Sequence, residues 1–135
     1  MSCSGKSTLA FELEETLKDK ISNIVLLDGD SVRSLFGDNL GYKKADRIRQ
    51  IKRLQKISLI LYNQGSFVIV AALYSNEDLL DWNRKNISSY YEILMEASID
   101  VLSKRDELGL YNSDPPIKNV VGVDIEWNAP LNPDM

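Results

Sequence analysis

The chain has 135 residues and a mass of 15.3 kDa, enough for one domain but not for a catalytic domain plus a full second domain. Its 16 lysines and arginines against 20 aspartates and glutamates give a net charge of −4, so nothing global attracts nucleic acid or an anionic membrane. One cysteine and no histidine exclude an internal disulfide, a zinc site and histidine-based catalysis.

The sequence also lacks the marks of a membrane or exported protein. No apolar run reaches the roughly 18 residues that a membrane span needs, and the N-terminus lacks the apolar stretch of a signal peptide. We therefore expect a soluble, cytoplasmic protein. Because the whole chain is acidic, any anionic ligand must be held by local positive groups.

The N-terminal part of the chain predicts a helix followed by a strand. Leu9, Leu13 and Leu17 recur at helical spacing after Gly5, with charged residues between them, which is typical of an amphipathic helix. The apolar run 23–28 then ends in an acidic residue and fits a buried parallel strand.

The rest of the chain continues this alternation. A long charged helix is predicted over 43–63 and a second buried strand over 66–72. Strands separated by helical segments predict an α/β fold whose parallel sheet is covered by helices on both faces. The remaining segments are predicted as a helix (77–88), a third strand (91–97), a short helix (100–106), a loop (112–119) and an irregular tail (129–135).

The first chemical motif precedes the first predicted helix and consists of Ser4, Gly5, Lys6, Ser7 and Thr8. It is the second half of G-x-x-x-x-G-K-[ST], in which backbone N–H groups hold phosphates, the lysine reaches the β- and γ-phosphates, and the hydroxyl binds Mg²⁺. The first glycine of the motif and the strand that leads into it are missing from this chain. By itself the pentapeptide is equally consistent with the cap of an ordinary helix.

The second motif is Asp28-Gly29-Asp30, at the end of the strand predicted over 23–28. Open α/β sheets bind their ligands at the carboxyl ends of strands. Two carboxylates beside a phosphate loop can orient magnesium-bound water and accept a hydroxyl proton. A turn followed by a helix cap is the commoner explanation of such a tripeptide taken alone.

With both motifs in place, the chain resembles the adenylylsulfate kinase family of P-loop small-molecule kinases. The resemblance implies a sheet flanked by helices on both faces, with its first, central strand missing here. It also implies one kinase domain over 1–135, incomplete at the N-terminus and at the C-terminus. The matching stretches, in the order and spacing of the family, are Ser4–Ala10, Leu27–Arg33, Leu40–Arg47, Arg105–Tyr111 and Ile117–Asp124, followed by Ala129-Pro130 and Pro133.

The activity implied by the resemblance is transfer of the γ-phosphoryl group of ATP to the 3′-hydroxyl of adenylylsulfate (APS), with Mg²⁺ as the metal. Lys6 would neutralise the transferring group and Ser7 would hold Mg²⁺. Asp28 and Asp30 would be the hydroxyl-orienting base and the ligand of magnesium-bound water, in an order that stays open. The implied ATP-binding residues are Ser4, Gly5, Lys6, Ser7, Thr8 and Arg105, and the implied substrate-binding residues are Asp30, Arg33, Tyr42, Arg47 and Gln50.

The departures from the family pattern cluster on the acceptor side. Gln50 replaces an asparagine, Tyr74 stands where the family has a serine, Leu108 replaces a lysine of the lid, and Val120 replaces an aromatic that stacks on adenine. Kinase chemistry is therefore better supported than APS as the acceptor. A kinase for a related nucleotide-linked anion, such as cytidine diphosphoramidate, and a non-catalytic nucleotide-binding protein are the alternatives. A homodimer is compatible with the sequence, whereas nucleic-acid and membrane partners are not expected.

The missing central strand leads to an expectation about stability. Its neighbours would be left with unpaired backbone groups, each costing on the order of 1 to 3 kcal/mol if buried. Net stability is only about 5 to 15 kcal/mol. We therefore expect the 135-residue chain by itself to be poorly stable or inactive, and a form extended at its N-terminus to be the working enzyme.

Overall fold

A parallel pair of strands packed between helices forms the centre of the protein. The computed structural model describes residues 3–37, 39–106, 109–111 and 113–135. Within these residues β1 (Ile24–Asp28) runs parallel to β2 (Phe67–Ala71), with Ile24 opposite Phe67 and Asp28 opposite Ala71. The strands predicted over 23–28 and 66–72, and their parallel pairing, are thus confirmed.

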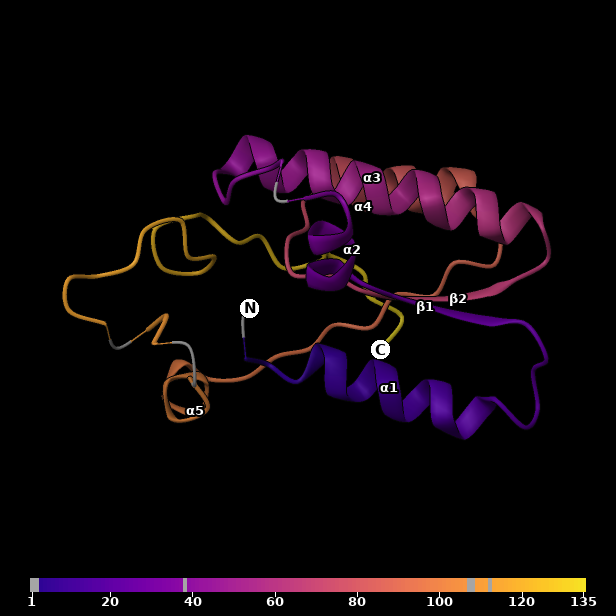
Figure 1. Ribbon diagram of the computed structural model, residues 1–135, viewed down its shortest axis with the longest axis horizontal. Helices are drawn as coiled ribbons and strands as arrows, with labels where there is room; N and C mark the ends of the chain where they lie inside the picture. The colour runs from indigo at the N-terminus through magenta and orange to yellow at the C-terminus, as the bar shows by residue number, and fades with distance from the viewer. Residues whose placement is uncertain (1–2, 38, 107–108, 112) are drawn as a thin grey trace.

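Helices cover both faces of this pair, as predicted: α1 lies on one side and α3 with α4 on the other (Figure 1). Both strands end at the side where α2 and the N-terminus lie. The predicted helices are present, with ends that differ by at most two residues, and none in the described residues is both long and apolar enough to cross a bilayer. Their bounds are α1 (Lys6–Leu17), α2 (Gly29–Leu35), α3 (Lys44–Asn63), α4 (Glu77–Asn86) and α5 (Ile99–Lys104).

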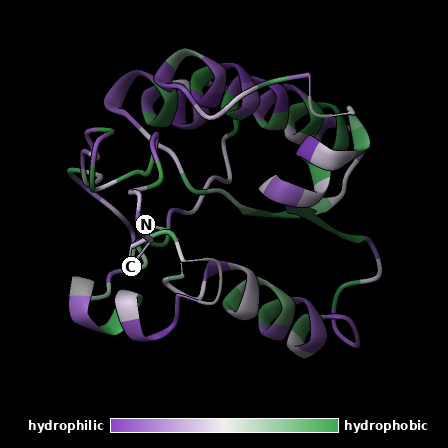
Figure 2. Ribbon diagram, turned by 60° about the vertical axis from the view of Figure 1, so that its left-hand side comes forward, coloured by the Kyte–Doolittle hydropathy of each residue, from purple (hydrophilic) through white to green (hydrophobic). Residues whose placement is uncertain are grey.

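The long helix α3 is amphipathic and carries polar side chains into its contact with α4. Leu54 is 2% exposed on its inner face, and hydrophobic colour follows the strands beneath it (Figure 2). The amide of the buried Gln55 donates to the carbonyl of Leu79 and to Oδ1 of Asn83, both at 2.8 Å. Because buried amides need partners, these bonds specify how α3 and α4 pack.

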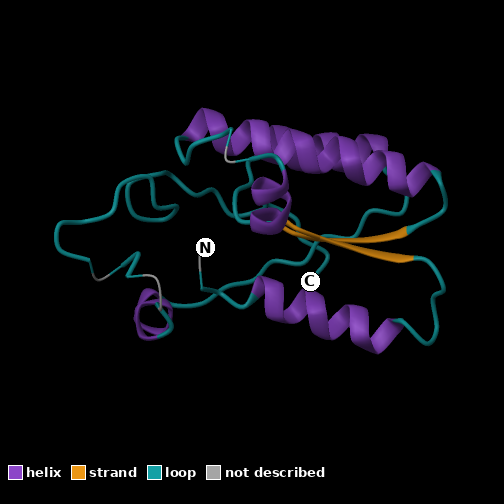
Figure 3. Ribbon diagram, viewed as in Figure 1, coloured by secondary structure: helices purple, strands orange, loops and turns teal. Residues whose placement is uncertain are grey.

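The third strand predicted over 91–97 is wrong, because this segment is a loop (Figure 3). Its backbone pairs with the C-terminal tail instead of the sheet: Leu94 N donates to the Met135 carbonyl and Asp134 N to the Glu92 carbonyl, both at 2.8 Å. This pairing involves too few residues to form a strand ladder. The irregular tail predicted over 129–135 is confirmed.

A polar cluster ties this loop and the tail to α4. One Arg84 nitrogen lies 3.3 Å from the carboxylates of both Glu92 and Asp134. The Tyr90 hydroxyl donates to Glu92, which is 7% exposed, at 3.2 Å. Burial, reinforced by the Glu92 charge and opposed by the bond from Asn83, raises the pKa of Tyr90 to about 12.

This pKa makes stability fall between about pH 10 and pH 12. An unfolded tyrosine loses its proton near pH 10, whereas Tyr90 in the folded chain keeps it to about 12. In that window the unfolded state binds fewer protons, so rising pH favours unfolding. Ultraviolet titration of the six tyrosines should show a late step near pH 12 that Tyr90→Phe removes and the exposed control Tyr91→Phe leaves. A wild-type titration with no step above the ordinary tyrosine range, which is centred near pH 10, would contradict this.

Candidate active site

The predicted phosphate loop enters α1 through a left-handed residue. Gly5, the N-cap of α1, has φ of 89° and ψ of 13°, and Cys3, two residues earlier, has φ of 58°. Only glycine adopts such a φ without steric cost, which explains Gly5 at this turn. The first N–H groups of a helix lack intrahelical acceptors, so this end of α1 is suited to bind an anion.

Asp28, the last residue of β1, links this loop to the next helix. Ser7 Oγ donates to its Oδ2 at 2.8 Å, while its Oδ1 caps α2 by accepting from Asp30 N at 3.2 Å and Ser31 N at 3.0 Å. Burial acts to raise the pKa of the Asp28 carboxyl, but the bonds from Ser31 and Ser7 outweigh it and the net pKa is lowered. Asp28 is therefore a carboxylate at neutral pH.

Lys6 places a positive charge between the loop and the two acids. Its Nζ donates to Ser4 Oγ at 3.2 Å. Burial lowers the pKa of Lys6, and the attraction of the Asp30 and Asp28 carboxylates opposes that shift. The ammonium and the carboxylates thus face the same space from different segments of the chain.

Two buried arginines and one aromatic ring form the other half of the site. Arg33 donates from Nη1 to the carbonyls of residues 40 and 41, at 2.9 and 2.8 Å. Arg47 donates to the Tyr42 carbonyl at 2.9 Å and to the Asn119 carbonyl at 2.6 Å. Both guanidinium groups lie over the Tyr42 ring, 4.8 and 5.6 Å from its centroid. Burial, together with the Arg33 charge, lowers the pKa of Arg47.

Both halves line a single cleft of about 1350 Å³ at the carboxyl ends of β1 and β2. Every site residue predicted from the sequence lies on its wall, including the exposed Arg105 at the end of α5. The structure thus brings together residues from α1, the turn after β1, α3 and the C-terminal third of the chain. The predicted residues that line the cleft are Ser4, Gly5, Lys6, Ser7, Thr8, Asp28, Asp30, Arg33, Tyr42, Arg47, Gln50 and Arg105.

Sequence reasoning missed the turn that supports Arg47. Asp124 accepts from the backbone N–H groups of Asn119 at 2.6 Å and Val120 at 2.5 Å. Asn119 is in the left-handed conformation, with φ of 66°, and its carbonyl is the one that Arg47 binds. Asparagine tolerates the left-handed conformation and aspartate is common in turns, so these residue types, with Gly122 between them, are the sequence signal for a turn here.

The replaced family positions differ in where they lie. Tyr74 is 4% exposed, lines the cleft and packs with Leu79 and Val121 in the core. Val120 also lines the cleft and is 3% exposed, so its side chain belongs mainly to the interior. Leu108 lies outside the described residues.

The oxygen ligands near the loop fit a magnesium ion held partly by phosphates. Ser7 Oγ and the Asp28 carboxylate, already 2.8 Å apart, are hard donors of the kind Mg²⁺ prefers. The described residues contain no cluster of three or more acidic, histidine or cysteine side chains that would form a complete metal cage. Mg²⁺ in nucleotide sites commonly uses one or two protein ligands with waters and phosphates, so the pair suffices.

Comparisons with known proteins point in one direction. A sequence model described as adenylylsulphate kinase matches residues 1–135. The cytidine diphosphoramidate kinase of Campylobacter jejuni is 40% identical over 129 residues, covering 94% of this chain and 75% of that protein. The adenylyl-sulfate kinase of Rippkaea orientalis is 33% identical over 137 residues, covering 100% of this chain and 76% of that protein.

A solved structure agrees with these relatives. The APS kinase of Mycobacterium tuberculosis in complex with AMPPNP and APS matches with a TM-score of 0.87 and 30% identity, over 98% of this chain and 80% of that one. The fold is therefore that of the P-loop kinases, as the resemblance implied. Since the family match spans the cleft and all the residues that line it, the chain belongs to the adenylylsulfate kinase family of phosphotransferases.

Proposed function

We propose that the protein transfers the γ-phosphoryl group of ATP to the 3′-hydroxyl of APS. The observation that carries this proposal is the meeting of a phosphate loop, two acids and a pair of arginines on Tyr42 in one cleft. Phosphoryl transfer needs mainly positioning and stabilisation of charge, and a site without histidine supplies both.

The loop side suits the donor nucleotide. The N-terminal N–H groups of α1 and the Lys6 ammonium would bind the β- and γ-phosphates, and Arg105, which lines the same cleft, would contact ATP. Ser7, with Asp28 directly or through water, would hold Mg²⁺. The ion would supply charge neutralisation on the phosphate oxygens.

The two acids differ in ways that assign their roles. Asp28 already accepts bonds from Ser7 and Ser31, which hold its carboxylate on the loop side. Asp30 is exposed and shares the cleft with the arginines. We assign Asp28 to the magnesium side and Asp30 to the acceptor. As the acceptor oxygen bonds to the γ-phosphorus and the bond to the β-phosphate oxygen breaks, Asp30 takes the hydroxyl proton.

The arginine side suits an anionic acceptor. Arg33 and Arg47 are buried and held by carbonyls, so their orientation is set before any ligand arrives. Guanidinium groups bind sulfate or phosphate oxygens through paired N–H donors. Tyr42 is 54% exposed, which leaves ring surface for stacking on the acceptor base.

A second acceptor, cytidine diphosphoramidate, is favoured by two observations. The Campylobacter jejuni enzyme named for that compound is 40% identical, against 33% for the Rippkaea orientalis adenylyl-sulfate kinase. In addition, Val120 is buried where an aromatic would stack on adenine. Losing one face of an aromatic clamp costs about 1 to 3 kcal/mol of base stacking, which weakens the preference for adenine.

A panel of acceptors tests this proposal. With MgATP and the full-length protein, we expect release of ADP to require an acceptor and APS to support it. Turnover with cytidine diphosphoramidate and none with APS would replace the first acceptor by the second. Binding of MgATP by calorimetry without ADP release on either acceptor would show a non-catalytic nucleotide-binding protein.

The assignment of the two acids predicts different defects. Asp30→Asn should lower kcat by about 10²- to 10⁴-fold with MgATP binding retained, because the proton acceptor is lost. Asp28→Asn should instead raise the Mg²⁺ concentration needed for half-maximal rate. The control Asp81→Asn, on the outer side of α4 and paired with Lys85, should behave as wild type. Full kcat in Asp30→Asn would refute the assignment.

A further inference from the structure

A chain of hydrogen bonds runs from α3 to the turn that carries both acids, and its outer member is Arg53. We propose that Arg53 is a positioning residue for the phosphoryl transfer: it orients the Gln50 amide, which in turn holds the Gly29–Asp30 peptide. This inference rests on the proposed function, because Asp30 matters only if it serves the reaction. Arg53 itself is not among the residues that line the cleft.

The first step is the orientation of the Gln50 amide. Arg53 Nη1 donates to Gln50 Oε1 at 3.1 Å, and Gln50 Nε2 donates to the Gly29 carbonyl at 2.9 Å. Gln50 is 4% exposed, so a reversed amide would leave a buried acceptor facing a carbonyl. Arg53 has donors only, and it therefore selects the orientation that presents Nε2 to Gly29.

The second step is the peptide that this bond holds. Its carbonyl accepts from Gln50, and its nitrogen, on Asp30, donates to Asp28 Oδ1 at 3.2 Å. A Cβ built on Gly29 would lie 3.1 Å from the Ala71 carbonyl oxygen, so the backbone at Gly29 packs closely against the end of β2. The peptide between the acids is thus held at both ends, and its rotation would move the Asp30 backbone.

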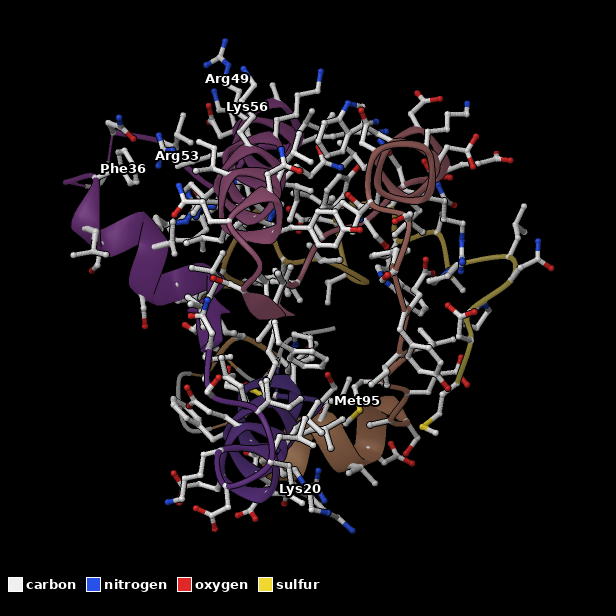
Figure 4. The ribbon with its side chains drawn as sticks, turned by 90° about the vertical axis from the view of Figure 1, so that its right-hand side faces the viewer. Lys20, Phe36, Arg49, Arg53, Lys56 and Met95 are labelled. Atoms are coloured by element: carbon white, nitrogen blue, oxygen red, sulfur yellow. The ribbon has the colours of Figure 1, made fainter. Side chains whose placement is uncertain are left out.

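The third step is the contact that the other nitrogen of the Arg53 guanidinium, Nη2, makes with a neighbouring loop. Arg53 Nη2 donates to Asn39 Oδ1 at 3.0 Å, and the group lies 4.1 Å from the centroid of the Phe36 ring (Figure 4). Phe36 and Asn39 flank the start of the loop whose carbonyls at 40 and 41 hold Arg33. The planar Arg53 guanidinium therefore connects the turn that carries Asp28 and Asp30 to the loop that holds Arg33. A lysine ammonium lacks the two separate N–H arms needed to bind both partners at once.

Neighbours on the same helix provide the contrast. Arg49 and Lys56 point away from the protein in Figure 4, while Arg53 lies beside Phe36. The Arg49 side chain is 69% exposed and pairs with Asp46. Arg49→Met therefore removes a charge of the same kind from the same helix without touching the Gln50 bonds, and it is the matched control.

The test compares Arg53→Met, Arg53→Lys and Arg49→Met in the intact chain. We expect kcat to fall about 10- to 100-fold in Arg53→Met, with the dissociation constant for MgATP unchanged, because the acid is displaced but the phosphate loop is not. Arg53→Lys should not restore kcat, and Arg49→Met should match wild type. Wild-type kcat in Arg53→Met, or full rescue by lysine, would overturn the proposal.

A double-mutant comparison separates positioning from general loss of structure. If Arg53 acts through Gln50, adding Arg53→Met to Gln50→Met should cause little further loss of kcat, whereas additive losses would overturn the proposal. Thermal unfolding of each variant supplies the check on folding: a kcat defect that disappears well below the midpoint of unfolding would also overturn it.

One readout does not depend on turnover. In amide ¹⁵N spectra, Arg53→Met should shift the Asp30 resonance and leave that of Leu9 on α1 in place, whereas Arg49→Met should shift neither. If wild type turns over neither acceptor, the proposed function fails, while this spectrum still decides whether Arg53 holds the Asp30 backbone in place. An unmoved Asp30 resonance in Arg53→Met would refute the positioning role.

Discussion

The Asp28 carboxylate is the point on which the site depends. One of its oxygens accepts from Ser7 in the phosphate loop, and the other caps α2 through Asp30 N and Ser31 N. It therefore joins the start of α1 to the end of β1 and to the start of α2. The pairing of β1 with β2 brings these ends together, because parallel strands present their carboxyl ends at the same edge.

A locally positive cleft in an acidic protein follows from where the cations are buried. The chain carries a net charge of −4, yet Lys6, Arg33 and Arg47 all face one cavity. Backbone carbonyls hold both arginines, so their charge stays available to a ligand. The cations gathered in the cleft therefore attract anions although the protein as a whole is acidic. Nucleotide anions are the ligands that such a cleft favours.

Much of the architecture was predictable because its signals are local. The periodicity of the helix after Gly5 and the apolar runs that became β1 and β2 each lie within a short stretch, and the residues of both sequence motifs line one cleft. The strand predicted over 91–97 was wrong because the partners of this segment are distant in the sequence. Its apolar residues suit a strand, but its backbone found partners in Asp134 and Met135, which no local pattern reveals. Gln50 lines the cleft, and the bonds of its amide to the Gly29 carbonyl and Arg53 were not foreseen from the sequence.

The amino-acid sequence by itself determined the class of fold, the phosphate loop and the pair of acids, because backbone propensity, hydrophobic period and motif chemistry all act over a few residues. Only the tertiary structure decided which backbone groups the side chains of the site bind. Arg47 binds a carbonyl 72 residues further along the chain, and Gln50 binds one 21 residues before it. Such contacts depend on how helices and strands pack around the sheet, and it is that packing which turns separate motifs into one site.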